Sequence, residues 1–298
     1  MMRLGLVGSG RWGQNIARTL RSFPDVEVVA VPKNQIFLSG VNGILIATPS
    51  DLHAHAALPY IEAGIPTFIE KPMATSMTDA ERIRDAAERS GTPVFVGHLY
   101  LYHPAIRAAL DLAPTLGKVR HLLCEGMNDR PRSGGVIWDW LPHHLSVGRA
   151  VFGCEPSSVT AWDLSGETYP KVAMTKFMFG DVPLVSTASW LSPVPRKNFT
   201  LVCEGATLVF DDTAERKLVL HRTDGSLLYP DYSQEPPLAA ELRAFLQVVR
   251  TGQPDAPHIQ TGLAVVRSIV AAEKALFSGL SVTIPLDASP PNHDYLPT

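Results

Sequence analysis

The sequence predicts an α/β Rossmann domain followed by a second, α+β domain built on an open, mainly antiparallel sheet. Three observations carry this prediction: a glycine-rich turn after the first apolar segment, alternating strand-like and helix-like segments over the first third, and strand-rich segments afterwards. Strands that alternate with helices indicate right-handed βαβ units around a parallel sheet. We expect a Rossmann-type dinucleotide-binding domain at 1–118 and a domain for substrate binding and oligomerisation at 119–298.

The elements of the first domain follow from short apolar runs and the residues that end them. Residues 3–7 form an apolar run that enters the glycine turn, and residues 14–21 have helical composition. Beyond them we expect strands at 26–31, 43–48, 65–69 and 93–97, and helices at 52–62 and 78–91. The last of these helices has a capping box from Thr78 to Glu81 and ends at Gly91.

After Gly117 the pattern changes to strand-rich segments that are separated by short turns, which indicates an antiparallel sheet. The predicted strands are 119–125, 158–164, 172–179, 184–191, 198–203, 207–210 and 218–220. One helix is expected within this region, at 143–152, and two more close the chain, at 238–250 and 259–277.

Composition and charge exclude several classes of protein. Of 298 residues, 45% are hydrophobic and 18% are charged, which favours a packed core over disorder. A formal net charge of -3 without a basic run argues against a nucleic-acid partner. Cys124, Cys154 and Cys203 are far apart, so we expect neither a disulfide framework nor a structural zinc site. No apolar stretch approaches the roughly 18 residues of a spanning helix, and no leader is evident, so we expect a cytoplasmic protein without a membrane partner.

A glycine-rich segment between a strand and a helix is the predicted cofactor-binding loop. It fits G-x-G-x-x-G and consists of Gly8, Ser9, Gly10, Arg11, Trp12 and Gly13. Glycines there permit close approach of the backbone to a pyrophosphate at the helix N-terminus. An acid that would hold the ribose hydroxyls is missing after the second strand. Lys33 stands there instead and would favour the 2′-phosphate of NADP, with a solvated turn lysine as the alternative.

Two further motifs lie at the ends of predicted elements. Glu70-Lys71-Pro72 follows a strand, and Gly134-Gly135 opens a Gly-Gly-x-x-x-Asp-x-x-x-His segment that contains Asp139 and His143. Together with the glycine loop, these motifs resemble the Gfo/Idh/MocA family of NAD(P)-dependent oxidoreductases over essentially the whole chain. The resemblance implies a dehydrogenase or reductase acting on CH-OH groups. It would transfer a hydride between NAD or NADP and a secondary alcohol or ketone of a sugar, cyclitol or related polyol.

The resemblance also implies that Lys71, Asp139 and His143 form the catalytic group. Alcohol oxidation needs a base for the hydroxyl proton, and a histidine titrates near neutrality, so His143 is the expected base. Lys71 would stabilise alkoxide character on the substrate oxygen, and Asp139 would orient the pair. We expect the helix to start near Leu141, with Asp139 ahead of it, because Pro142 favours a helix start. Alone, each residue also fits a structural role as a loop lysine, a helix cap or a core histidine.

Other residues complete the implied site. The residues expected near the cofactor, besides the glycine loop and Lys71, are Lys33, Thr48, Pro49, His53 and Glu70. The residues expected near the substrate are His98, Arg130, Arg132 and His144, and His144 is also a rival for the base. Arg130 and Arg132 would bind an acidic substrate group, with a solvated loop as the alternative. No metal is expected, because neither His-x-His nor His-His places two ligands on one helix face.

The chain departs from the family after its second strand. Only about a dozen residues separate Val31 from Ile44, where the family has a helix and a further strand, so the adenosine side is shortened. Two alternatives follow: a catalytically silent, dehydrogenase-like binding protein, and an NAD-dependent glycoside hydrolase of the same fold. The retained catalytic group argues against the silent protein. The open sheet face predicts a homo-oligomer joined through it, besides a small-molecule polyol or sugar partner.

Overall fold

A computed structural model describes residues 1–298 except 33–34, 36, 132–134, 168, 255–257 and 287–298. The chain divides into two compact units. The first comprises Met1–Tyr102 and Glu235–Val266, and the second comprises His103–Gln234 and the residues described from Arg267 onward. This division differs from the boundary expected at residue 118, because residues 103–118 join the second unit and 235–266 join the first.

The first unit is built on a parallel sheet of five strands in the order β2-β1-β3-β4-β5. The strands are β1 (Met2–Val7), β2 (Val26–Ala30), β3 (Gly43–Ile46), β4 (Thr67–Glu70) and β5 (Val94–Gly97). Every residue of β3, β4 and β5 is buried, as expected when helices cover both faces of a parallel sheet. The predicted Rossmann architecture is therefore confirmed.

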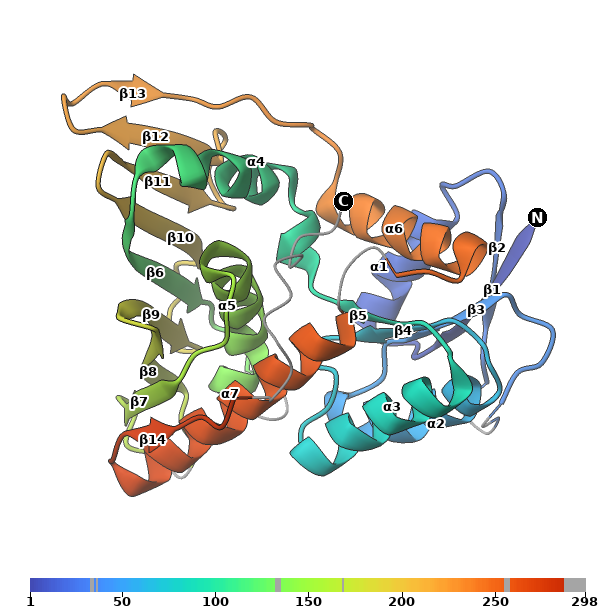
Figure 1. Ribbon diagram of the computed structural model, residues 1–298. Helices are drawn as coiled ribbons and strands as arrows, with labels where there is room; N and C mark the ends of the chain where they lie inside the picture. The colour runs from blue at the N-terminus through green and yellow to red at the C-terminus, as the bar shows by residue number, and fades with distance from the viewer. Residues whose placement is uncertain (33–34, 36, 132–134, 168, 255–257, 287–298) are drawn as a thin grey trace. The chain divides into compact units, whose positions relative to one another are not determined.

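Four helices cover this sheet: α1 (Arg11–Leu20), α2 (His53–Glu62), α3 (Met77–Ser90) and α6 (Pro237–Thr251). In Figure 1, α1 and α6 lie on one face, and α2 and α3 lie on the other. The helix that was expected at 14–21 begins earlier, directly after Gly10. The cap expected at Thr78 is corrected to Ser76, whose side chain accepts a hydrogen bond from the Asp79 amide. No helix or strand occurs in the described part of 31–42.

The second unit contains a nine-stranded sheet in the order β13-β12-β11-β10-β6-β9-β8-β7-β14. Its strands are β6 (Val119–Met127), β7 (Ser158–Asp163), β8 (Val172–Phe179), β9 (Val182–Ser189), β10 (Arg196–Cys203), β11 (Ala206–Asp211), β12 (Leu218–Arg222), β13 (Leu227–Leu228) and β14 (Val282–Thr283). All described pairings are antiparallel except the parallel pair β6 and β9. The expected open, mainly antiparallel sheet is confirmed.

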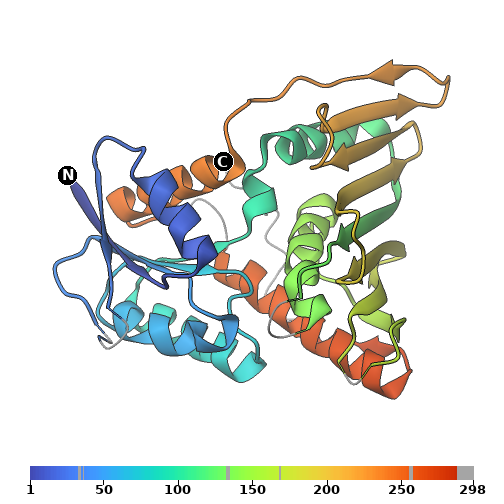
Figure 2. The same cartoon turned by 180° about the vertical axis from the view of Figure 1, so that it is seen from behind.

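Helices α4 (Pro104–Leu112) and α5 (Val136–Phe152) lie on one face of this sheet, and no described helix of the unit covers the other (Figure 2). The last helix, α7 (His258–Ser278), begins in the first unit and ends in the second. Helix α4 was not expected from the sequence. Within the described ranges, no helix is long and apolar enough to cross a lipid bilayer.

Helix α5 begins earlier than expected, and this corrects the prediction that Asp139 precedes it. Residues 136–142, the first two turns of α5, are all buried. Their packing outweighs the loss of the backbone hydrogen bond that Pro142 cannot donate. Two long-range hydrogen bonds fix the turn. Trp138 Nε1 donates to Glu273 Oε1 at 2.7 Å, and Trp190 Nε1 donates to Asp139 Oδ2 at 3.1 Å.

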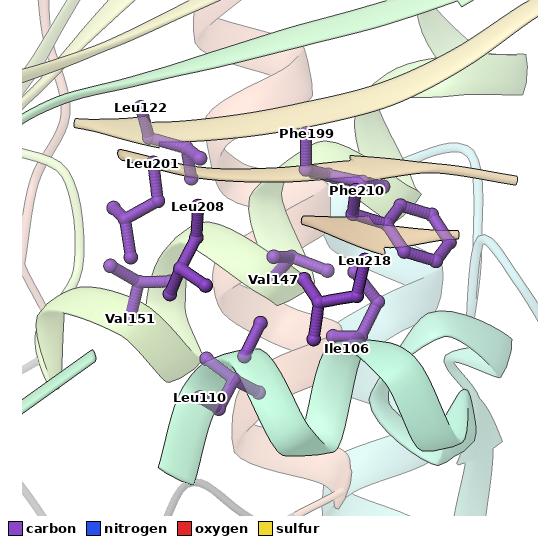
Figure 3. A pocket seen from close by; sticks show the side chains of 11 residues that line it. Ile106, Leu110, Leu122, Val147, Val151, Phe199, Leu201, Leu208, Phe210 and Leu218 are labelled. Atoms are coloured by element: carbon purple, nitrogen blue, oxygen red, sulfur yellow. The ribbon is translucent and has the colours of Figure 1, made fainter. Parts of the chain in front are cut away.

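A small cavity lies between the covered face of the sheet and helices α4 and α5 (Figure 3). Its volume is about 20 Å³, and its lining is apolar, with Leu122, Leu208 and Phe210 from the sheet and Ile106 and Val147 from the helices among the lining side chains. Ligand pockets usually measure about 300–1,000 Å³, so this cavity is a packing feature of the core.

Enlarging this cavity is expected to destabilise the second unit. Leu208 is 2% exposed, so Leu208→Ala should lower the free energy of unfolding by about 2–5 kcal/mol. Chemical denaturation followed by circular dichroism measures the change. Leu164→Ala is the matched control, because Leu164 is 55% exposed and should change stability by less than about 1 kcal/mol. Equal losses in the two variants would contradict the packing described here.

Candidate active site

Four loops of the first unit meet at one edge of its sheet. The carboxyl ends of parallel strands lie at the same edge, and this edge is where doubly wound folds bind their ligands. Gly8 follows β1, Thr48 lies two residues after β3, Lys71 follows β4, and His98 follows β5. The structure therefore gathers most of the residues that were expected near the cofactor.

The three glycines of the loop differ in backbone conformation and in the space around them. Gly8 has φ +118°, and a Cβ there would overlap the carbonyl group of Ala47. A Cβ on Gly13 would overlap the Gly8 carbonyl oxygen, so Gly13 allows α1 to pack closely on the loop. Gly10 has φ -67°, and a Cβ there would meet nothing within 4 Å. The fold itself therefore requires glycine at Gly8 and Gly13. At Gly10 the fold would accept a side chain, because the space beside it is open.

The N-terminus of α1 has the properties of an anion site. Gly10 is its N-cap residue, no side chain caps the helix, and its first turn contains no acid. The first amide groups of a helix attract phosphate when nothing else satisfies them. Beside this loop, Thr48 Oγ1 is buried and has no hydrogen-bond partner among the described residues. The open Gly10, the uncapped helix and this hydroxyl all fit a dinucleotide cofactor.

Glu70 connects the glycine loop to the Glu-Lys-Pro segment. Its Oε1 accepts a hydrogen bond from Trp12 Nε1, and its Oε2 accepts one from the Lys71 amide at 3.2 Å. Burial raises the pKa of Glu70 to about 7, while the Trp12 hydrogen bond and the charge of Lys71 act in the opposite direction. Only 8% of Glu70 is exposed, whereas Trp12 is 38% exposed. Glu70 thus links the glycine loop to the Glu-Lys-Pro segment through hydrogen bonds to a buried carboxyl group.

His53 connects the two loops that follow β3 and β4. Its Nδ1 lies 2.8 Å from the Pro72 carbonyl oxygen, and its Nε2 lies 3.1 Å from the Thr48 carbonyl oxygen. The ring is 1% exposed, and burial lowers its pKa, although both carbonyl contacts act to raise it. The side chain of His53 therefore positions the loops from within the unit. The neighbouring Pro49 is exposed.

In the second unit, Asp139 and His143 lie one turn apart on α5 and so share one face of the helix. The hydrogen bond from Trp190 fixes one carboxylate oxygen of Asp139, which is 8% exposed. His143 is only partly buried, and its ring centroid lies 6.2 Å from that of Trp140. This arrangement orients the carboxylate and leaves part of the imidazole accessible.

The structure distinguishes His144 from its neighbour. His144 is 1% exposed, and its Nδ1 lies 2.7 Å from Ser186 Oγ on β9. Its ring stacks on Trp140 and meets the edge of Phe199. His144 therefore packs against the sheet, which favours His143 as the base.

The remaining candidates differ in exposure. His98 is 1% exposed, whereas Arg130 is 67% exposed and lies 4.0 Å from Asp129. Lys33 and Arg132 lie outside the described residues. Among the residues that the structure does describe, no group of three or more His, Cys, Asp or Glu side chains could hold a metal ion.

Sequence reasoning missed the residues that support this site from distant segments. Trp190 binds Asp139, and Ser186 contacts His144, but both lie more than 40 positions away along the chain. No local pattern marks them, because a hydrogen-bond partner on another strand follows only from the sheet register.

Comparisons with known proteins identify several similar chains. Residues 33–98 match the model of an oxidoreductase family with an NAD-binding Rossmann fold, GFO_IDH_MocA. The chain is 28% identical to the rhizopine catabolism protein MocA of Rhizobium meliloti over 52% of its own length and 59% of that protein's. It is 23% identical to UDP-N-acetylglucosamine 3-dehydrogenase of Acidithiobacillus ferrooxidans, with 96% of this chain and 98% of that protein covered.

A solved structure from Magnetospirillum magnetotacticum MS-1, described as an oxidoreductase, is also similar. Its TM-score is 0.80 and its sequence identity 29%, over 91% of this chain and 99% of that chain. The Rossmann unit, the open sheet of the second unit and these matches lead to one conclusion. These matches support the Gfo/Idh/MocA family of oxidoreductases, whose matched model describes an NAD-binding Rossmann fold.

Proposed function

We propose that the protein transfers a hydride between a nicotinamide cofactor and a secondary alcohol or ketone of a sugar, cyclitol or related polyol. The observation that carries this proposal is the set of loops at the carboxyl edge of the five-stranded sheet. There the open Gly10, the uncapped α1 and the linked Glu70 and Lys71 lie within one unit. Such an edge suits a pyrophosphate beside a reactive group.

The described residues divide into those that would touch the cofactor and those that would position them. The amides at the start of α1 would bind the pyrophosphate, and Thr48 Oγ1 would supply a hydrogen bond. Glu70 and His53 would hold the loops in place, because their polar atoms bind groups of the protein itself. When bound, the nicotinamide ring supplies a hydride acceptor or donor.

The residues of the chain would perform the proton transfer. In the oxidation direction, His143 would accept the proton of the substrate hydroxyl, and Asp139, fixed by Trp190, would orient the imidazole. Lys71 would donate a hydrogen bond to the same oxygen and stabilise its developing negative charge. The carbon–hydrogen bond would then break as the carbonyl double bond forms, and its electron pair would leave as a hydride to the oxidised form of the bound cofactor.

The substrate class rests on the relatives. UDP-N-acetylglucosamine 3-dehydrogenase, which the chain matches over nearly its whole length, is named for the oxidation of a ring hydroxyl of a sugar. A polyol offers several such hydroxyls. An acidic group on the substrate would suit the exposed Arg130.

Binding of the cofactor is the first test of this proposal. Titration with NADH and with NADPH should raise the melting temperature, because a ligand at 100 times its dissociation constant adds about 2.7 kcal/mol of stability. Differential scanning fluorimetry measures the shift, and the ratio of the two dissociation constants reports the preference between the nucleotides. A protein that responds to neither nucleotide would instead be a catalytically silent binding protein.

We also propose a homo-oligomer joined through the uncovered face of the nine-stranded sheet. A row of directly paired side chains crosses this face, and most of its members are apolar. From β8 to β12 the row consists of Lys176, Val185, Leu123, Thr200, Val209 and Val219. Leu123, near its centre, is 40% exposed. A second copy of the sheet would cover this row and remove its apolar surface from water.

Leu123→Lys should therefore convert the oligomer to a monomer, because the lysine places an unpaired charge in the interface. Size-exclusion chromatography with light scattering gives the molar mass. Leu164→Lys, on an exposed residue after β7, is expected to leave the mass unchanged. A wild-type protein that is monomeric at micromolar concentration would disprove the proposed interface.

A further inference from the structure

One of the five tryptophans of the chain has a buried indole N–H group that the site described so far does not use. Three of the others donate from Nε1 to a carboxylate group, in the pairs Trp12–Glu70, Trp138–Glu273 and Trp190–Asp139. A fourth, Trp162 on β7, is 46% exposed to solvent. Trp140 differs from all four. It is 6% exposed, and its Nε1 is buried without a hydrogen-bond partner among the described residues.

A buried indole N–H without an acceptor calls for a physical explanation. The indole nitrogen is a donor only, and buried tryptophans usually place it on an acceptor. An unpaired buried donor destabilises the fold, because water satisfies the same group in the unfolded chain. A phenylalanine would fill much of the same space without this penalty. Packing alone therefore does not account for the indole nitrogen of Trp140.

Trp140 lies among the residues that are expected to transfer the proton. It follows Asp139 directly and precedes His143 by three positions on α5, so its side chain and the imidazole are neighbours on the helix. The centroids of the two rings lie 6.2 Å apart, and their planes meet at 62°. The indole of Trp140 is therefore in the immediate surroundings of the proposed base.

The sheet beneath Trp140 determines how its ring lies. A Cβ on Gly126 of β6 would overlap the indole, with Cδ2 nearest and Cε3 and Cγ next. Since Cδ2 lies at the fusion of the two rings, this order is expected when the face of the indole covers the glycine. The residue that pairs with Gly126 on β9 is also small, Ala188. An indole N–H bond lies in the plane of the ring, so it is directed along the sheet surface and not into β6.

We propose that Trp140 binds the substrate by donating a hydrogen bond from Nε1 to the oxygen on the carbon next to the reacting one. Sugars and cyclitols carry such a second oxygen, and a donor beside the base can bind it while the base holds the reacting hydroxyl. A simple secondary alcohol lacks this oxygen and would leave the N–H group unpaired, which is how a buried donor rejects an analogue. This inference rests on the proposed function, because the bound oxygen belongs to the substrate proposed there.

The indole N–H resonances of the ligand-free, full-length protein provide the first test. In ¹⁵N-edited spectra the signals of Trp12, Trp138 and Trp190 should lie downfield, because their N–H groups bind carboxylates, and the signal of Trp140 should lie upfield of them. Trp140→Phe assigns that signal. If this variant does not fold, single phenylalanine variants of the other four tryptophans assign it by elimination. A Trp140 signal among the downfield three would overturn the inference, because its donor would already be satisfied.

Polyol probes provide the second test. Methyl β-D-glucoside, myo-inositol and D-glucuronate would each be titrated into the protein in the presence of NADH, which cannot accept a hydride from them. A compound that binds should move the Trp140 signal downfield and leave the Trp162 signal in place. Trp140→Phe should weaken its binding about two- to tenfold, the usual contribution of one hydrogen bond, without changing the affinity for NADH. Trp162→Phe, the matched control, should change neither affinity.

Monodeoxy analogues of the compound that binds separate this role from packing. The analogue without the oxygen that Trp140 binds should have the same dissociation constant in the wild type and in Trp140→Phe, because neither complex contains the hydrogen bond. The parent compound should show the full difference. An indole needed only for packing would instead change the affinity for every analogue by the same factor and lower the melting temperature.

The outcomes are distinct from those of the proposed function. A compound that binds and is oxidised with NAD or NADP while the Trp140 signal stays in place would overturn the inference and leave the proposed function intact. If a polyol moves the signal but neither NADH nor NADPH raises the melting temperature, the contact is supported and only hydride transfer fails. If none of the three compounds moves any resonance of the protein, the inference is overturned together with the substrate class on which it rests.

Discussion

Replacing Lys71 with Met is expected to lower kcat by about 10²- to 10⁴-fold, the usual range for a group that assists proton transfer in the transition state. Methionine keeps the length of the side chain and removes its charge and its donors. Affinity for NADH should change little, because the Lys71 amide, which binds Glu70, is retained. Initial rates of NADH formation, with a polyol found by screening sugars, cyclitols and uronates, measure the effect. Lys274→Met, on an exposed position of α7, is the control.

The second half of this test concerns His143. His143→Asn should reduce kcat by a similar factor, and the double variant should lose much less than the product of the two factors, because both groups act on one step. Multiplicative losses would place Lys71 and His143 in separate steps. A kcat within a few-fold of the wild type in either single variant would remove that residue from the proposed catalytic group.

Gly10→Ala is expected to weaken NADH binding by about tenfold or more, which corresponds to at least about 1.4 kcal/mol. The new methyl group would occupy the open space beside the N-terminus of α1, where the pyrophosphate is expected. The free energy of unfolding should fall by no more than about 1 kcal/mol, because φ is -67° and the change affects only an N-cap residue. Isothermal titration calorimetry and chemical denaturation separate the two quantities.

Gly8→Ala is the contrasting variant on the same loop. Its φ of +118° and the overlap of a Cβ with the Ala47 carbonyl should lower the free energy of unfolding by more than about 2 kcal/mol. Gly8→Ala is therefore expected to reduce mainly the stability of the fold, and Gly10→Ala is expected to reduce mainly the affinity for NADH. Equal effects of the two variants on NADH affinity, with no loss of stability in Gly8→Ala, would contradict the assignment of these glycines.

Local sequence patterns predicted most of the first unit correctly. Buried apolar strands, a glycine turn and a helix that ends at Gly91 are features whose causes lie within a few residues, so they can be recognised in one dimension. Boundaries were harder to predict where packing competes with local preference. Helix α5 starts before Pro142 because its first two turns are buried, although a proline favours a helix start.

The candidate site was predictable only in part. Glu70 ends a strand, Lys71 follows it and His143 belongs to a motif, so the order of residues along the chain is enough to infer their place. The side chains that orient them could not be inferred in this way. Trp190, directly after β9, reaches Asp139, and Ser186 on β9 contacts His144. Such partners depend on which surfaces pack together, and no local spacing records that choice.

The sequence by itself determined the fold class and the glycine turn, because glycine, proline and apolar periodicity act over a few residues, and its motifs carried the resemblance to the family. Tertiary structure alone decided which unit contains α6, which of two adjacent histidines packs against the sheet, and which indole fixes the Asp139 carboxylate. The physical reason is burial. The free energy of a buried charge or hydrogen bond depends on the groups that surround it, and distant segments of the chain supply those groups.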